Sequence, residues 1–299
     1  MNDQSTELRF LGLCGADDSV DPKLLGLICN AYPFVEFGIL FRPDKEGQPR
    51  YASVDFVQRL SEVALRSAHK PSPSPAEENQ IPPPVSLPQN LPTMRLAAHL
   101  CGCRVNEVLN GDDRFLSTLP SLGFQRVQIN ATAVNGVDTS KLSDCVPSFV
   151  LLTTKYSKLE FILQKNEETK PLWEGVLNYS VNARATTGGH CGGDGLPSLP
   201  PNVTMLLDES KGTGVLSKTY PAPPDEYDVG YAGGIGPSNI IDVLDAIRTS
   251  GKGRAVWIDM ESRLRSTKDG RDVFDLDKCY ECIDAVCKAK FFSHPSYLA

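Results

Sequence analysis

Two residues that can exchange protons with a substrate stand at the ends of apolar segments. Cys14 directly follows the apolar segment 9–13, and Asp208 closes the apolar segment 203–208. A thiolate can act as a general base near neutral pH when its surroundings stabilise the anion, and a carboxyl group can act as a general acid when its pKa is raised. Each residue also has a structural interpretation: Cys14 as a buried thiol at a strand end, and Asp208 as a helix cap.

Further polar residues and glycines stand beside the ends of other apolar segments: Arg50, Gln128, Asp259, Ser262, Gly233 and Gly234. The two glycines precede Pro237 and Ser238, which can open a helix. Glycines let backbone N–H groups approach an anion, and a helix N-terminus favours negative charge. The glycine pair therefore predicts a phosphate site, with a tight structural turn as the alternative.

The elements that must position these residues alternate between strand and helix. Eight short apolar segments predict strands at 9–13, 35–41, 96–100, 126–130, 149–153, 203–208, 228–232 and 255–260. Helical patterns lie between them and are clearest at 54–67, 238–248 and 277–291. Alternation is typical of a parallel sheet, and eight units favour a closed (β/α)₈ barrel (a TIM barrel) over an open sheet. We expect one α/β barrel domain over 1–299, with its active site at the carboxyl ends of the strands.

Two segments interrupt the alternation and predict loop insertions. Residues 71–93 are rich in proline, and residues 186–202 are rich in glycine and proline. Neither composition suits a helix or a strand. The proline-rich insertion is interpreted either as an inert loop or as a contact for a partner.

The composition restricts the partners. The formal net charge of −7 provides no attraction to nucleic acid. No segment approaches the ~18 apolar residues that a membrane helix needs. The polar N-terminus does not resemble a secretory signal, and nine cysteines, an odd number, fit free thiols in a reducing compartment. We therefore expect a cytoplasmic protein.

Cysteine and histidine residues do not predict a metal site. Cys279 and Cys282 have C-x-x-C spacing, but they lie in a predicted helix without a second pair of ligands. His190 and Cys191 lie in the glycine-rich insertion, and His99 at a strand end is either a hydrogen-bonded core residue or a catalyst. We expect no metal and no cofactor, and a small molecule as the ligand.

Five short motifs are spread along the chain: G-L-C-G-A at 12–16, F-R-P through R-Y-A-S within 41–53, L-L-D at 206–208, Y-A-G-G-I-G-P-S-N-I at 231–240 and I-D-M-E-S-R-L-R at 258–265. In order and spacing they resemble the motifs of phosphoribosylanthranilate isomerase, a (β/α)₈ enzyme of tryptophan biosynthesis. The resemblance covers nearly the whole chain outside the two insertions.

The resemblance implies an Amadori rearrangement, in which an aldose-derived amine becomes an amino-ketose. Cys14 would be the general base and Asp208 the general acid, and Arg50 would pair with a carboxylate of the substrate. Gly233 and Gly234 would hold the phosphate of a sugar-phosphate substrate. Gln128 matches the glutamine of the family's fourth strand.

The chain departs from the family at two places. Asn130 replaces a histidine after the fourth strand, and Glu261 with Arg263 replaces small residues that approach the phosphate. A carboxylate beside a phosphate is unfavourable unless Glu261 points away or pairs with Arg263 or Arg265. Two alternatives therefore stay open: a barrel enzyme acting on a different small carboxylated substrate, and a non-catalytic barrel that serves as a binding or scaffold protein.

Overall fold

The computed structural model describes residues 8–68, 94–187, 198–210, 213–217, 219–251 and 253–292. The proline-rich insertion 71–93 lies outside the described residues, as do residues 188–197 of the second insertion. Within the described part of the chain, no helix combines the length and the apolar character needed to cross a bilayer.

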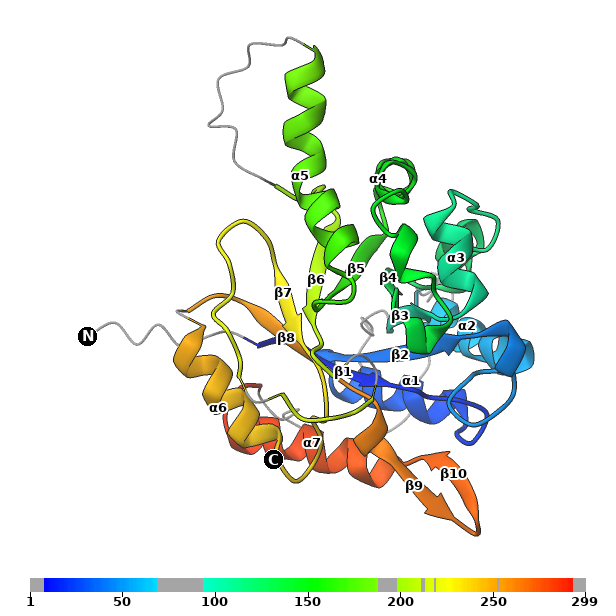
Figure 1. Ribbon diagram of the computed structural model, residues 1–299. Coiled ribbons are helices and arrows are strands. Elements are labelled where there is room, and N and C mark those ends of the chain that lie inside the picture. The colour runs from blue at the N-terminus through cyan, green and yellow to red at the C-terminus, as the bar shows by residue number, and fades with distance from the viewer. Residues whose placement is uncertain are drawn as a thin grey trace, which may run out of the picture.

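Eight parallel strands close into a barrel in chain order, which confirms the predicted (β/α)₈ fold (Figure 1). The strands are β1 (Leu8–Cys14), β2 (Val35–Phe41), β3 (Arg95–Leu100), β4 (Arg126–Ile129), β5 (Glu160–Lys165), β6 (Val203–Leu207), β7 (Val229–Tyr231) and β8 (Val256–Met260). Closure pairs β1 with β8, and Gly12 lies opposite Asp259 in that register. The carboxyl ends of the first and last strands are therefore neighbours.

The fifth strand does not lie where the sequence pattern placed it. Residues 149–153 belong to a helix, α4 (Val146–Lys155), and the strand follows at β5. A short apolar run cannot be assigned to strand or helix by periodicity alone. Phe149 and Leu152 are buried whereas Leu151 is 69% exposed, which is the spacing of a helix face. Pro147 in the first turn, where proline is tolerated, is a second indication of a helix.

Helices cover the outside of the barrel: α1 (Pro22–Ala31), α2 (Val54–Ala68), α3 (Cys103–Leu109), α4, α5 (Lys170–Thr187), α6 (Ile240–Ser250) and α7 (Leu276–Lys288). The predicted helices at 54–67, 238–248 and 277–291 correspond to α2, α6 and α7. In α6 the buried residues Ile240, Val243, Leu244 and Ile247 form one apolar face, which packs against the barrel. This helix begins two residues after Ser238, so Pro237 and Ser238 belong to the preceding turn.

A buried cluster of charges fills the amino-terminal end of the barrel. Arg126, the first residue of β4, binds Glu36 and Glu160 at 2.7 Å each. Its guanidinium group also contacts the rings of Phe10 and Trp257, which stack on each other, at 4.4 and 4.6 Å from the ring centroids. This cluster lies at the opposite end of the barrel from the strand ends that carry Cys14, His99 and Asp259.

A two-stranded antiparallel hairpin lies between β8 and α7, formed by β9 (Arg265–Lys268) and β10 (Arg271–Phe274) (Figure 1). Arg265 at its start is only 3% exposed as a side chain, and it binds Asp272 of the facing strand at 2.8 Å. The hairpin is thus attached to the mouth of the barrel by a buried arginine.

Candidate active site

A cavity of about 210 Å³ opens at the carboxyl ends of the strands. Seven of the eight candidate residues from the sequence line it: Arg50, Gln128, Asp208, Gly233, Gly234, Asp259 and Ser262. The eighth, Cys14, is 1% exposed and lies behind this wall, in contact with Asp259. Residues from separate strands are thus gathered at the one face of the barrel where enzymes of this fold carry their chemistry.

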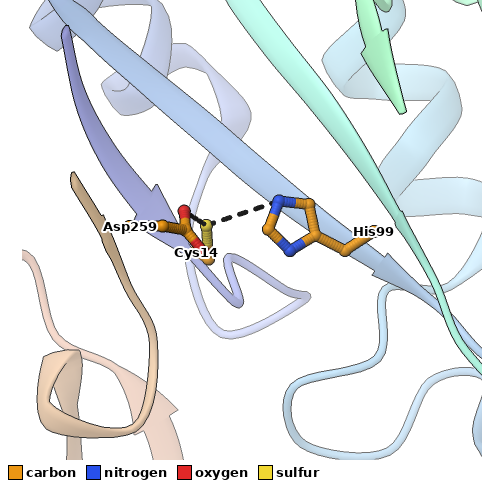
Figure 2. Close-up of side chains that lie close together, drawn as sticks. All are labelled: Cys14, His99 and Asp259. Carbon is orange, nitrogen blue, oxygen red and sulfur yellow. Dashed lines mark hydrogen bonds between the residues drawn. The ribbon is translucent and has the colours of Figure 1, made fainter. Parts of the chain in front are cut away.

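Cys14, His99 and Asp259 form a compact cluster at this face (Figure 2). They lie at the ends of β1, β3 and β8. Cys14 Sγ donates a hydrogen bond of 2.5 Å to Asp259 Oδ1. On its other side, Cys14 Sγ lies 3.6 Å from His99 Nε2.

Two glycines make room for this cluster. Gly38 on β2 lies between Cys14 and the strand of His99, and a Cβ atom at Gly38 would stand 2.3 Å from Cys14 Sγ and 2.8 Å from His99 Nε2. A Cβ atom at Gly12 would stand 2.5 Å from Asp259 Oδ1. Because Gly38 lacks a side chain, Cys14 of β1 and His99 of β3 can meet across β2, and the lack of one at Gly12 leaves room for Asp259 of the neighbouring β8.

Burial controls the protonation of the cluster. Burial raises the pKa of the Cys14 thiol well above its ordinary value, and the neighbouring acids Asp259, Glu36 and Glu261 raise it further. Burial also raises the pKa of Asp259 to about 7 and lowers the pKa of His99 to about 3. At neutral pH Cys14 is therefore a thiol and His99 is uncharged, while Asp259 is poised to exchange a proton. The expected Cys14 thiolate is not the resting state.

Asp208 stands on another wall of the cavity, directly after β6. Its Oδ1 atom accepts hydrogen bonds from Ser210 Oγ at 2.5 Å and Ser210 N at 3.1 Å. Its Oδ2 atom accepts one from Gln164 Nε2 at 3.0 Å. The Oε1 atom of Gln164 is buried and has no hydrogen-bond partner among the described residues. Gln164 lies on β5, so the misplaced fifth strand concealed it from the sequence analysis.

Arg50 is held by acids from three parts of the chain. Its backbone has the left-handed φ of 78°, which is costly for a residue other than glycine, and its N–H donates to Asp17 Oδ2 at 2.6 Å. Its guanidinium group binds Glu261 at 3.2 Å and Asp272 at 3.4 Å. Glu261 therefore pairs with Arg50, whereas the sequence suggested either a Glu261 that points away from a phosphate or one that pairs with Arg263 or Arg265. A ligand carboxylate that binds Arg50 has to compete with Glu261.

Gly233 and Gly234 both have positive φ values, of 99° and 64°. A Cβ atom at Gly234 would stand 2.5 Å from Leu216 N, so the loop after β6 packs directly on this glycine. Asn239 closes the turn by donating to Gly234 O at 2.9 Å and accepting from Gly236 N at 2.9 Å. These contacts account for the glycines as a tight turn and a close approach between two loops. A phosphate role for the pair stays a prediction.

Two further polar residues line the cavity near β4. Gln128 Nε2 donates to Asn130 Oδ1 at 2.8 Å, and Asn130 Nδ2 donates to Cys101 Sγ at 3.3 Å. Asn130 stands where the resembling family carries a histidine, and here it orients Gln128. The rim of the cavity also carries Arg42 and Lys45, which follow β2.

No protein-family model and no curated protein sequence matches the chain. Among solved structures, the chain is similar to phospho-2-dehydro-3-deoxyheptonate aldolase (DAHP synthase) from Thermotoga maritima, with a TM-score of 0.43 and 10% identity over 96% of this chain and 70% of that chain. The strands themselves define the class: the chain is a (β/α)₈-barrel protein with a polar cavity at the mouth of the barrel.

Proposed function

We propose that the chain is an acid–base enzyme that isomerises an aldose-type substrate to a ketose-type product, as the resemblance to phosphoribosylanthranilate isomerase implies. The observation that carries the proposal is the hydrogen-bonded pair of Cys14 and Asp259, 2.5 Å apart at the wall of the cavity that Asp208 also lines. Carboxyl groups on two walls of one cavity suit the transfer of a proton onto one substrate atom and off another, and burial raises the pKa of Asp259 to about 7.

In this proposal Asp208, when protonated, donates its proton to the ring oxygen of the sugar, and the ring opens to a Schiff base. The pair of Cys14 and Asp259 then accepts the proton from C2, and the electrons of the C–H bond form the enol-type intermediate that becomes the ketone. Asp259 lines the cavity, whereas Cys14 lies behind it. Cys14 therefore takes part through the proton that it shares with Asp259.

The remaining polar groups of the cavity suit an anionic, hydroxyl-bearing substrate. Arg42, Lys45 and Arg50 place cationic groups at the cavity wall and rim. The unpartnered Oε1 atom of Gln164 can accept a hydrogen bond from a substrate hydroxyl beside Asp208. Cationic groups with a neighbouring acceptor are what a sugar acid or sugar phosphate requires.

The test of the proposal is whether purified protein converts phosphoribosylanthranilate. The loss of anthranilate fluorescence measures this conversion. The variants Cys14→Ala, Asp259→Asn and Asp208→Asn each remove one proton-transfer group and should lower kcat/KM by about 100-fold or more. Cys29→Ser, at a buried thiol on α1, serves as the matched control. Wild-type turnover no greater than that of Asp208→Asn would overturn the specific activity.

One observation favours a second candidate, a substrate with a carboxylate and no phosphate. Glu261 lies in the cavity beside the position where the resembling family holds phosphate, and the loop after β6 covers Gly234. A screen of thermal stability separates the two candidates: stabilisation by nonphosphorylated acids, and not by sugar phosphates, supports the second. The opposite result supports the first.

The state of the cysteines agrees with a reducing compartment such as the cytoplasm, which we include in the proposal. The eight cysteines in the described part of the chain are all free. Most are buried in the apolar core, where free thiols are ordinary constituents of proteins in reducing compartments.

A further inference from the structure

Cys14, His99 and Asp259 bring together three chemically different metal ligands. Each offers one ligand atom, a sulfur, a ring nitrogen and a carboxylate oxygen, and the three atoms lie within 4.8 Å of one another. Cys14 and His99 are buried, and they come from different strands, so the barrel itself holds the three ligands in place. The sequence alone predicts no metal ligand among them.

The distances fit a small tetrahedral ion. Zinc binds thiolate at about 2.3 Å and imidazole at about 2.0–2.1 Å, so the two ligand atoms of a tetrahedral site lie about 3.6 Å apart. The observed distance between Cys14 Sγ and His99 Nε2 is 3.6 Å. The distance of 2.5 Å between Cys14 Sγ and Asp259 Oδ1 has to widen by about 1 Å for both atoms to bind the ion.

The charge of the three ligands suits a divalent cation. Glu36 and Glu261 also act electrostatically on Cys14, whereas Arg126 acts on His99 and Asp259 and is itself paired with Glu36. A divalent ion held by one thiolate, one carboxylate and one neutral imidazole forms a centre without net charge, which a buried position tolerates best. Thiolate and imidazole ligands select ions of the zinc class over magnesium and calcium.

We propose that Cys14, His99 and Asp259 form a binding site for a divalent ion of the zinc class, with its fourth coordination position open to the cavity. His99 and Asp259 line that cavity, so a water molecule or a substrate oxygen can complete the coordination. Three protein ligands and one open position are the arrangement of catalytic rather than structural zinc sites.

The metal site goes beyond the proposed isomerase and shares Cys14 and Asp259 with it. When the ion binds, Cys14 loses its thiol proton to solvent and coordinates the ion as a thiolate. One molecule therefore holds either the ion or the shared proton. Zinc binding without isomerase activity, or isomerase activity without zinc binding, would each separate one proposal from the other.

The probe for the site is Co²⁺, which reports thiolate ligation by a charge-transfer band in the near ultraviolet. The titration uses reduced, full-length protein in which Cys191, the exposed Cys103 and the partly exposed Cys145 are changed to serine, so that fewer thiols compete for the ion. We expect one equivalent of Co²⁺ to produce the band and one equivalent of Zn²⁺ to abolish it.

Variants of the three ligands test the assignment. Cys14→Ser should remove the band. Removing a residue that only hydrogen-bonds a metal ligand lowers metal affinity by roughly 10–100-fold, so His99→Asn and Asp259→Asn, which remove a ligand itself, should weaken Co²⁺ binding by at least that much. Cys29→Ser, the buried control, should keep the band and the affinity. A band that persists in Cys14→Ser would overturn the proposal. Binding that is unchanged in both His99→Asn and Asp259→Asn would do the same, and these two variants remain informative if Cys14→Ser does not fold.

Discussion

Cys14 Sγ donates a 2.5 Å hydrogen bond to Asp259 Oδ1, and the two residues are 245 positions apart in the chain. They meet because β1 and β8 are neighbours in the closed barrel. The central pair of the candidate site is therefore formed only when the first and last strands pair, so the integrity of the site depends on barrel closure.

The raised pKa of Asp259 predicts that stability falls as the pH rises. The carboxyl group has a pKa of about 7 in the folded protein, against about 3.9 for an unperturbed aspartate in the unfolded chain. The folded state thus holds the proton more tightly, and this stabilisation is fully present below about pH 4 and is lost as the pH rises through about 7. The loss is up to about 4 kcal/mol.

Asp259→Asn should remove this component of the pH dependence. Urea unfolding of wild type and variant at several pH values between 5 and 8 measures it. The two curves of unfolding free energy against pH should differ in slope, with the variant flatter. Parallel curves would contradict the raised pKa of Asp259.

The raised pKa of the Asp259 carboxyl group also predicts the pH profile of the proposed reaction. Asp259 accepts a proton only when it is ionised, so kcat/KM should rise with pH through about 7. In Asp259→Asn this rising limb should disappear along with most of the activity. Cys29→Ser should keep the wild-type profile, and a wild-type limb well away from pH 7 would exclude Asp259 as the acceptor.

Gly38→Ala should disrupt the cluster of Cys14, His99 and Asp259. The added methyl group would stand 2.3 Å from Cys14 Sγ and 2.8 Å from His99 Nε2. Such overpacking costs about 1–3 kcal/mol of stability. In a Cys14→Ala background the contact with Sγ is absent, so Gly38→Ala should cost less stability. The unfolding free energies of wild type, the two single variants and the double variant form a thermodynamic cycle that measures the difference. Equal costs in both backgrounds would show that Cys14 does not cause the strain.

Arg126→Met should destabilise the barrel strongly, because it leaves Glu36 and Glu160 without the cation that they bind at 2.7 Å. Breaking a buried pair of this kind costs about 3–5 kcal/mol. Arg9→Met provides the matched control, since its pair with Asp228 is exposed and should contribute at most about 1 kcal/mol. Chemical denaturation measures both, and equal losses would contradict the role of burial.

Glu261→Gln should strengthen the binding of anions in the cavity. The substitution removes one of the two carboxylates that bind the guanidinium group of Arg50, at 3.2 Å, so a ligand anion competes only with Asp272 for this group. A gain of about 1 kcal/mol corresponds to about fivefold tighter binding. Titration with anthranilate and with inorganic phosphate, followed by calorimetry, measures it. Asp272→Asn removes the other acid beside Arg50 and lies outside the cavity lining, so it should have the smaller effect.

The sequence pattern predicted the barrel and the face that carries the site, because seven of its eight strands are apolar segments with clear boundaries. The fifth strand was missed because the apolar run of α4 is as strand-like as β5 over a few residues. That error concealed Gln164, the partner of Asp208.

Other parts of the site depend on three-dimensional packing. The strand-end positions of His99 and Asp259 were visible in the sequence, but their contact with Cys14 requires the strand register and the empty space at Gly38. The pairing of Arg50 with Glu261 joins loops that are 211 positions apart, whereas Arg263 and Arg265 stand within four positions of Glu261 along the chain.

Arg265 binds Asp17 at 2.7 Å, Asp272 at 2.8 Å and the carbonyl oxygen of Gly15 at 2.7 Å. Asp17 in turn holds the backbone of Arg50. One buried side chain thus couples the loops after β1 and β2 to the hairpin of β9 and β10. This side of the mouth should therefore evolve by coordinated sets of substitutions, because a change at any one of these residues alters the support of the others.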